Sequence, residues 1–206
     1  MESLRLASMV DATSAEGPGL RFALWTQGCP LACPGCCNPH LWTERGGGSF
    51  SVDAVWERVA ASRERHRELE GLSLIGGEPF EQDEPLAALS TRARASGLTV
   101  MAYTGYTIEE LRARGSALLQ AVDLLVDGRY VEALRTTKRR FIGSTNQRLF
   151  FLSDAYREDD PRFREPNHAE LRLDHQGELT VVGFPFERVM SEFGPGSRLH
   201  KERRVP

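Results

Sequence analysis

Four cysteines fall within nine residues of this 206-residue chain, and the sequence has no others. Cys29, Cys33 and Cys36 form a C-x3-C-x2-C array, and Cys37 follows directly. Thiolates grouped on one loop bind soft cations, so in a reducing compartment they indicate metal or redox chemistry rather than a disulfide framework. Three such thiolates can hold three irons of a 4Fe-4S cube and leave the fourth iron without a protein ligand. The loop therefore predicts an iron–sulfur centre with one open coordination position.

A structural zinc ion is the alternative interpretation, with Cys37 or His40 as the fourth ligand. Zinc sites favour paired C-x2-C units, and the sequence has no second pair. Adjacent residues seldom point at one metal, so we expect Cys37 to be a packed or spare thiol rather than a ligand. Spacing alone leaves both interpretations open.

The strands and helices that position this loop can be predicted from short apolar runs that alternate with helical patterns. Residues 20–27 predict a strand that leads into the cysteines, and further strands are predicted at residues 72–75, 98–103 and 124–126. Ser51 can cap a helix that begins at Val52, a second helix is predicted over residues 84–96, and Thr107 can cap a third. This alternation indicates parallel strands joined by helical crossovers.

The predicted fold class is therefore α/β, an incomplete TIM-like β/α barrel with parallel strands. A complete eight-unit barrel takes about 250 residues, which is more than the chain offers. We expect residues 1–150 to form this core. Beyond them the alternation stops, and residues 169–182 predict a hairpin around positions 174–177. Residues 151–206 are expected to form a C-terminal extension packed on the same domain.

Composition narrows the range of partners. Lys and Arg total 26 against 29 Asp and Glu, which gives a net charge of -3 and offers no bulk attraction for nucleic acid or acidic membranes. The first residues lack a secretion-signal pattern, and no stretch approaches the ~20 apolar residues that span a bilayer. We therefore expect a cytoplasmic protein without nucleic-acid or membrane partners.

Several further motifs accompany the cysteine array. They lie at residues 17–21 (GPGLR), 38–39 (NP), 76–79 (GGEP), 103–107 (YTGYT), 123–129 (DLLVDGR) and 143–148 (GSTNQR). Together with the array, they resemble the radical S-adenosylmethionine superfamily. Within it, the chain is most similar to the small activating enzymes of anaerobic ribonucleotide reductase and pyruvate formate-lyase. The resemblance covers roughly residues 3–150.

The resemblance implies two cofactors, a [4Fe-4S] cluster on Cys29, Cys33 and Cys36 and S-adenosylmethionine chelated to the open iron. An electron from the reduced cluster then cleaves the sulfonium to give a 5′-deoxyadenosyl radical, so the cofactors perform the difficult step. Gly76 and Gly77 suit this site because a turn without side chains lets the backbone approach the methionine amino group. Glu78 can add an anionic partner for that amino group.

Four more residues are assigned to the same site. The resemblance places Arg129 near the methionine carboxylate and Thr104 on the wall of the cofactor cavity. Asp127 is expected beside Arg129, where it would orient the arginine or contact the ribose. Asn38 is expected to fix the cysteine loop by hydrogen bonds.

The function implied is that of an oxidoreductase that installs a glycyl radical on a partner enzyme and takes its electron from a flavodoxin- or ferredoxin-type donor. An alternative is a stand-alone radical enzyme acting on a small molecule or a ribosomal peptide, with the hairpin at residues 169–182 closing the cavity. A third reading, without catalysis, is a zinc-stabilised binding module.

Overall fold

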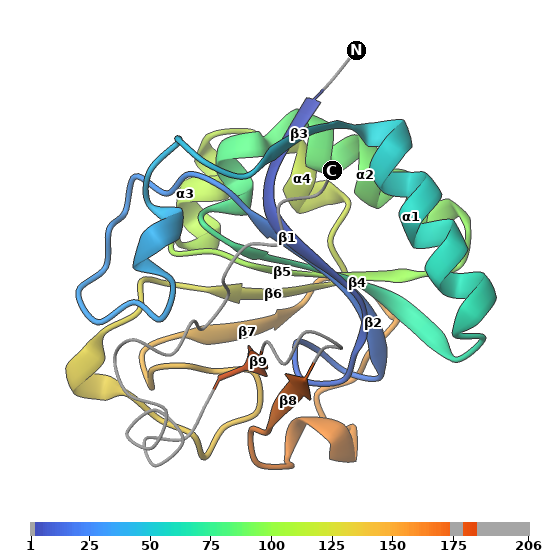
Figure 1. The fold of residues 1–206 in the computed structure, drawn as a ribbon. Helices are drawn as coiled ribbons and strands as arrows, with labels where there is room; N and C mark the ends of the chain where they lie inside the picture. The colour runs from blue at the N-terminus through green and yellow to red at the C-terminus, as the bar shows by residue number, and fades with distance from the viewer. Residues whose placement is uncertain (1–2, 174–178, 185–206) are drawn as a thin grey trace.

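A seven-stranded mixed sheet forms the centre of the protein (Figure 1). The computed structural model describes residues 3–173 and 179–184. The strands of the central sheet lie in the order β3-β1-β2-β4-β5-β6-β7. Their bounds are β1 Ser3–Thr13, β2 Leu20–Thr26, β3 Gly48–Ser51, β4 Leu69–Gly76, β5 Thr99–Tyr103, β6 Leu124–Asp127 and β7 Arg148–Phe151.

The four inner strands β2, β4, β5 and β6 run parallel, and this arrangement sets the position of the loops that follow them. Thr26, the last residue of β2, pairs with Gly76, the last residue of β4. The loops that follow these two strands therefore leave the sheet at the same edge. This is the edge at which the cysteine loop and the GGEP turn begin.

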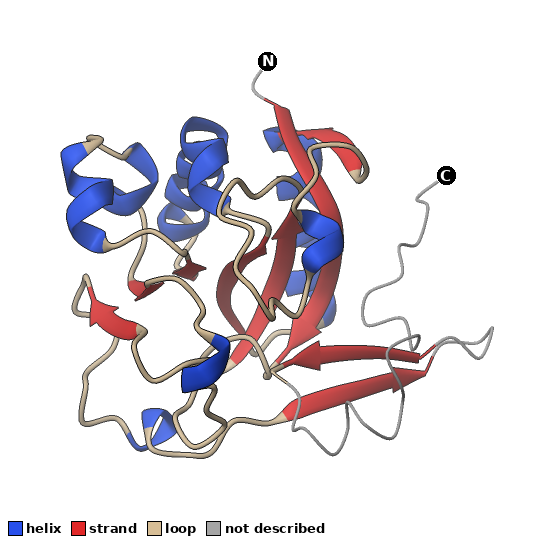
Figure 2. Cartoon of the chain, turned by 90° about the vertical axis from the view of Figure 1, so that its left-hand side faces the viewer, coloured by secondary structure: helices blue, strands red, loops and turns tan. Residues whose placement is uncertain are grey.

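Helices cover one face of the sheet (Figures 1 and 2). They are α1 Val52–Arg65, α2 Asp83–Ala95, α3 Ile108–Ala113 and α4 Ala117–Gln120. The hydroxyl of Ser51 accepts a hydrogen bond from the Ala54 amide at the start of α1, and Thr107 and Glu110 form a reciprocal capping box at the start of α3. Both predicted caps are confirmed.

Alternation along β2 divides its side chains between two cores. Phe22 and Leu24 point toward the helices and belong to the main core. Ala23 and Trp25 point to the other face, where Trp25 packs in a separate cluster with Val182. Loops cover that second face, together with a two-stranded antiparallel sheet of β8 Ala169–Leu173 and β9 Leu179–Gly183. The face opposite the helices is therefore the one that can enclose a cavity.

A buried arginine, Arg21, lies at the start of β2, at the end of the sheet opposite the cysteines. Arg21 is 0% exposed, and its guanidinium donates to the Ser73 hydroxyl at 2.8 Å, the Tyr156 hydroxyl at 3.1 Å and the Leu72 carbonyl at 2.5 Å. Burial lowers its pKa from the ordinary value. Neutral oxygen acceptors thus satisfy this side chain at the start of β2.

The mixed α/β class and the four inner strands are confirmed, whereas the outer strands differ from the sequence prediction. β1, β3 and β7 pair antiparallel with their neighbours, and none of them was predicted as a strand. β8 and β9 pair as two strands, and the predicted turn at positions 174–177 lies outside the described residues.

Short 3-10 helices lie at Pro39–Leu41, Pro79–Gln82, Glu132–Leu134 and Pro161–Phe163. Among the described helices, none has the length and apolarity needed to cross a bilayer.

Candidate functional site

The cysteine loop leaves β2 and folds back on the short helix that follows it. The Gly28 amide donates to the Leu41 carbonyl at 2.9 Å, and the Cys29 amide donates to the Trp42 carbonyl at 3.1 Å. The φ angle of Gly28 is +98°, a left-handed conformation that glycine adopts without strain. These bonds fix the entry to the loop just before its first cysteine.

Backbone amides surround the sulfurs of the array. The Asn38 amide donates to the Cys36 sulfur at 3.4 Å. Burial raises the pKa of Cys29 and Cys33 above the ordinary value, and nearby backbone amides, that of Tyr130 in the case of Cys33, oppose this rise. Each sulfur thus has a neighbouring donor of the kind that stabilises a metal-bound thiolate.

The donor set fits an iron–sulfur cluster. The three array cysteines are half-buried free thiols on one loop, and amide hydrogen bonds to sulfur are a means by which proteins tune such clusters. Among the side chains that the structure describes, no group of three or more His, Cys, Asp or Glu converges on a single-ion site. The fit therefore rests on ligand type, shared loop and amide environment.

Cys37 lies in a different environment from the array. Burial raises the pKa of its thiol, and the nearby Arg135 guanidinium lowers it by charge and by a hydrogen bond. Its thiol thus lies near an arginine. The prediction that Cys37 is not a ligand stays a prediction.

The GGEP turn is bonded directly to the start of the cysteine loop. The Gly77 amide donates to the Thr26 carbonyl, and the Glu78 amide donates to the Gly28 carbonyl, each at 2.8 Å. A Cβ at residue 77 would lie 2.2 Å from the Gly28 carbonyl oxygen. Only glycine permits this approach, so two motifs separated by about fifty residues form one structural unit.

Glu78 joins this unit to the end of β5. Its carboxylate is buried and accepts hydrogen bonds from the Thr104 hydroxyl at 2.9 Å and the Gly105 amide at 2.8 Å, as well as from the Phe80 amide at 3.1 Å. Burial raises its pKa to about 7. Three of the roughly four acceptor positions of a carboxylate are thereby filled by the protein. The structure thus brings Glu78 and Thr104 together, and most of the acceptor capacity of the carboxylate is used within the protein. The cofactor roles of both residues stay predictions.

Asp127 ends β6, Arg129 follows two residues later, and the two side chains lie in different surroundings. Asp127 is fully buried and accepts from the Ile108 amide at 2.7 Å and from two guanidinium nitrogens of Arg148 at 2.5 and 2.9 Å. Arg129 is exposed, and its charge partly opposes the rise that burial causes in the pKa of Cys33. The Asp127 carboxylate therefore bonds to Arg148 and to the Ile108 amide, and the site roles of Asp127 and Arg129 stay predictions.

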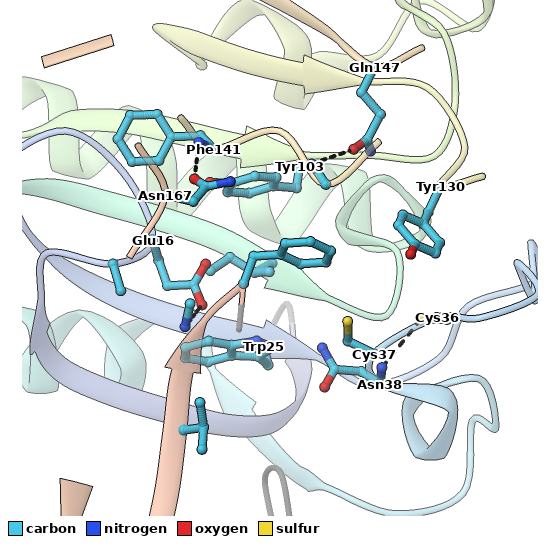
Figure 3. A pocket seen from close by; sticks show the side chains of 16 residues that line it. Glu16, Trp25, Cys36, Cys37, Asn38, Tyr103, Tyr130, Phe141, Gln147 and Asn167 are labelled. Carbon is cyan, nitrogen blue, oxygen red and sulfur yellow. Dashed lines mark hydrogen bonds between the residues drawn. The ribbon is translucent and has the colours of Figure 1, made fainter. Parts of the chain in front are cut away.

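A cavity of about 220 Å³ opens beside the cysteine loop on the face opposite the helices. Cys36, Cys37, Asn38 and Tyr130 lie at one end of it, and Glu16 lies toward the other (Figure 3). Apolar and aromatic side chains supply much of the remaining wall, among them Trp25, Ile75, Tyr103, Phe141, Val181 and Phe184. Such a wall limits the access of water.

Sequence reasoning assigned no role to Glu16 or Phe184, which both line this cavity. Glu16 accepts a hydrogen bond from the Gly183 amide at 2.7 Å, and burial raises its pKa to about 7. Its place directly before the GPGLR motif was the signal that could have revealed it. The sequence around Phe184 offers no comparable signal.

Comparisons with known proteins agree with this geometry. A family model described as a 4Fe-4S single cluster domain matches residues 15–150. The anaerobic ribonucleoside-triphosphate reductase-activating proteins of Salmonella typhimurium and Escherichia coli are each 33% identical over 141 residues, which is 66% of this chain and 92% of theirs. The chain belongs to this family. The namesake protein of Enterobacteria phage T4 is 34% identical over 143 residues, 68% of this chain and 88% of its own.

Membership determines the class of enzyme and its cofactors. The protein is a radical S-adenosylmethionine enzyme of the activase type, with a [4Fe-4S] cluster and S-adenosylmethionine as cofactors. This family relationship favours the iron–sulfur interpretation of the cysteine loop over the zinc interpretation. A crystal structure of QueE from Escherichia coli also matches, with 21% identity and a TM-score of 0.42 over 51% of this chain and 53% of the other.

Proposed function

We propose that this protein installs a glycyl radical on a partner enzyme of the anaerobic ribonucleotide reductase type. The observation that carries the proposal is the bonded unit of the Gly77–Glu78 turn and Gly28, which joins the cofactor turn to the cluster loop. Cys36, at the other end of that loop, lines the cavity. The relatives that share this region are activating proteins for such a reductase.

The residues around the loop divide the binding of the cofactors. Cys29, Cys33 and Cys36 would hold the cluster, while Gly76, Gly77 and Arg129 would receive the methionine end of S-adenosylmethionine. When bound and reduced, these cofactors supply a 5′-deoxyadenosyl radical that abstracts a hydrogen atom. Asn38 would hold the loop in place, since its backbone amide donates to the Cys36 sulfur.

The protein itself orients the reactants and excludes water. The Glu78 carboxylate ties the ends of β4 and β5 together, so the turn and Thr104 keep a fixed relation to the cysteine loop. Trp25, Ile75 and Phe141 give the cavity apolar walls, which protect a reactive radical from solvent. A partner loop that enters this cavity would reach the neighbourhood of Cys36 without crossing the helical face.

The wider arrangement forms part of the same proposal. The parallel strands β2, β4, β5 and β6 favour an incomplete barrel in the predicted core of residues 1–150. Residues 151–173 and 179–184 would form an extension on the same domain, and the rest of the predicted extension lies outside the described residues. The electron donor would be a flavodoxin- or ferredoxin-type protein. We place the reaction in the cytoplasm, where a reducing environment keeps the four cysteines as free thiols.

A stand-alone enzyme for a small molecule or ribosomal peptide is the second candidate. It is favoured by β9, which contributes Val181 and Gly183 to the cavity wall and so reduces the space for a large partner. In that case the hydrogen donor would be a free metabolite or peptide.

Electron paramagnetic resonance separates the two candidates. The reduced protein is mixed anaerobically with S-adenosylmethionine and an anaerobic ribonucleotide reductase, with the Cys33→Ala variant as the control. A glycyl doublet that forms only with the wild-type protein supports the activase. Deoxyadenosine that forms only when a small metabolite is present, without a glycyl signal, supports the second candidate instead.

A further inference from the structure

Part of the cavity wall comes from residues outside the region that the family model matches. That region ends at residue 150, whereas Asn167, Val181, Gly183 and Phe184 all line the cavity. These residues belong to β9 and the segments beside it. The shape of the cavity in this chain is therefore set in part by a segment that the matched family region lacks.

This part of the wall is held firmly in place. Val182 is fully buried in the cluster that contains Trp25, and the Gly183 amide donates to the Glu16 carboxylate at 2.7 Å. At the start of the two-stranded sheet, Glu170 accepts from the Ser14 amide, also at 2.7 Å. Buried apolar contact and charge-assisted hydrogen bonds thus fix β8 and β9 against the turn between β1 and β2.

The bend at Gly183 allows the next residue to face the cavity. Gly183 has a φ angle of +97°, and a Cβ there would lie 2.7 Å from the His168 carbonyl oxygen. A side chain at this position is excluded both by the backbone conformation and by the lack of space. Phe184 follows immediately and lines the cavity.

Phe184 contacts the side chains of Tyr130 and Arg135, which lie near the cysteine loop. Its ring centroid lies 6.2 Å from that of Tyr130, and the Arg135 guanidinium lies 4.2 Å above the Phe184 ring. The Tyr130 amide is near enough to Cys33, and the Arg135 guanidinium near enough to Cys37, to oppose the rise that burial causes in the pKa of each thiol. Phe184 therefore lies on the side of the cavity that Tyr130 shares with Cys36 and Cys37 (Figure 3).

We propose that Phe184 is a specificity-determining residue, whose ring limits the cavity beside the cysteine loop to a chain segment that carries glycine at the reacting position. This inference rests on the proposed function, since it concerns the hydrogen donor of that reaction. One extra carbon in a hydrophobic pocket changes discrimination by roughly 10-fold to 200-fold, so a ring that limits the space beside the reacting residue would disfavour alanine by a factor in that range.

The test compares two synthetic peptides that differ only in a central glycine or alanine. Each is offered anaerobically to the reconstituted wild-type protein, to Phe184→Ala, to Phe184→Trp and to the control Leu173→Ala. Leu173 belongs to β8 and is 72% exposed, so its loss alters the same extension without altering the cavity. Peptide affinity is measured by fluorescence anisotropy, and turnover by the deoxyadenosine formed above the level without peptide.

We expect the wild type and Leu173→Ala to prefer the glycine peptide by about tenfold or more in affinity and turnover. Phe184→Ala should bring that ratio close to one, mainly by improved binding of the alanine peptide, and Phe184→Trp should weaken binding of both peptides. An unchanged ratio in Phe184→Ala overturns the proposal, as does a wild type that binds both peptides equally. A wild type that discriminates in binding but yields no glycyl radical supports the role of Phe184 and overturns the proposed function alone.

Discussion

Replacing Gly77 with alanine tests the contact between the GGEP turn and the cysteine loop. The new Cβ would lie 2.2 Å from the Gly28 carbonyl oxygen and 2.8 Å from its carbonyl carbon. Both are backbone atoms, so neither can rotate away, and Gly28 must shift together with the adjacent Cys29. Because the backbone of Gly77 lies outside the left-handed region, the effect is steric rather than conformational.

The expected loss of stability has two parts. Overpacking against a rigid backbone costs about 1–3 kcal/mol. Displacing Gly28 also breaks the hydrogen bond that its carbonyl accepts from the Glu78 amide, which is worth about 1 kcal/mol. We therefore expect the free energy of unfolding of the cluster-free protein to fall by about 2–4 kcal/mol. Iron and sulfide per chain after anaerobic reconstitution should fall as well, because the first cysteine has moved.

Urea denaturation measures the first effect, and iron and sulfide analysis measures the second. Gly97→Ala is the matched control, because Gly97 has a φ angle of +87° and a Cβ there would meet nothing within 4 Å. That control should lose about 1–2 kcal/mol from backbone strain and keep its full complement of iron. A Gly77→Ala protein with wild-type stability and wild-type iron content would refute the claim that the two motifs form one unit.

Three further outcomes are expected. Cys33→Ala should lose the cluster whereas Cys37→Ala keeps it, as judged by iron and sulfide content, and cluster loss in the Cys37 variant would contradict our ligand assignment. Burial raises the pKa of Glu78 from 4.5 to about 7, so the folded protein binds this proton more tightly than the unfolded chain does. The free energy of unfolding should therefore fall by about 3 kcal/mol as the pH rises from 4.5 to about 7. In urea titrations at several pH values, Glu78→Gln should reduce this dependence of the free energy of unfolding on pH. The reduction should be partial, because Glu16 titrates in the same interval. An unaltered pH dependence would show that Glu78 is not the group responsible. Asp127→Asn leaves a buried donor of Ile108 or Arg148 without its acceptor. The free energy of unfolding, measured by urea denaturation, should therefore fall by about 2 kcal/mol. A variant as stable as the wild type would show that Asp127 does not hold β6 to α3.

The sequence predicts the inner fold well because its signals there are local. Apolar runs of strand length predict β2, β4, β5 and β6, and the hydroxyls of Ser51 and Thr107 mark the helix starts they cap. The meeting of the cysteine loop with the GGEP turn also follows from pattern, because parallel strands deliver their loops to the same edge.

The outer strands and the bonds of individual site residues are not predictable in this way. β1, β3 and β7 are antiparallel additions, which require no crossover helix and leave a weaker pattern. Glu78 bonds to Thr104, 26 positions away, and Asp127 to Arg148, 21 positions away. These partners depend on three-dimensional packing. The entry of Phe184 into the cavity likewise depends on how β9 docks, which no local signal specifies.

The hydrogen bond from Ser14 to Glu170 joins residues 156 positions apart, and it has a consequence for biosynthesis. The ribosome must translate most of the chain before the turn after β1 can complete its bonds and before Val182 can cover Trp25. During that interval an aromatic, apolar surface is exposed to other nascent chains, which favours aggregation. We expect the newly made protein to depend on chaperones until residues near 184 have emerged.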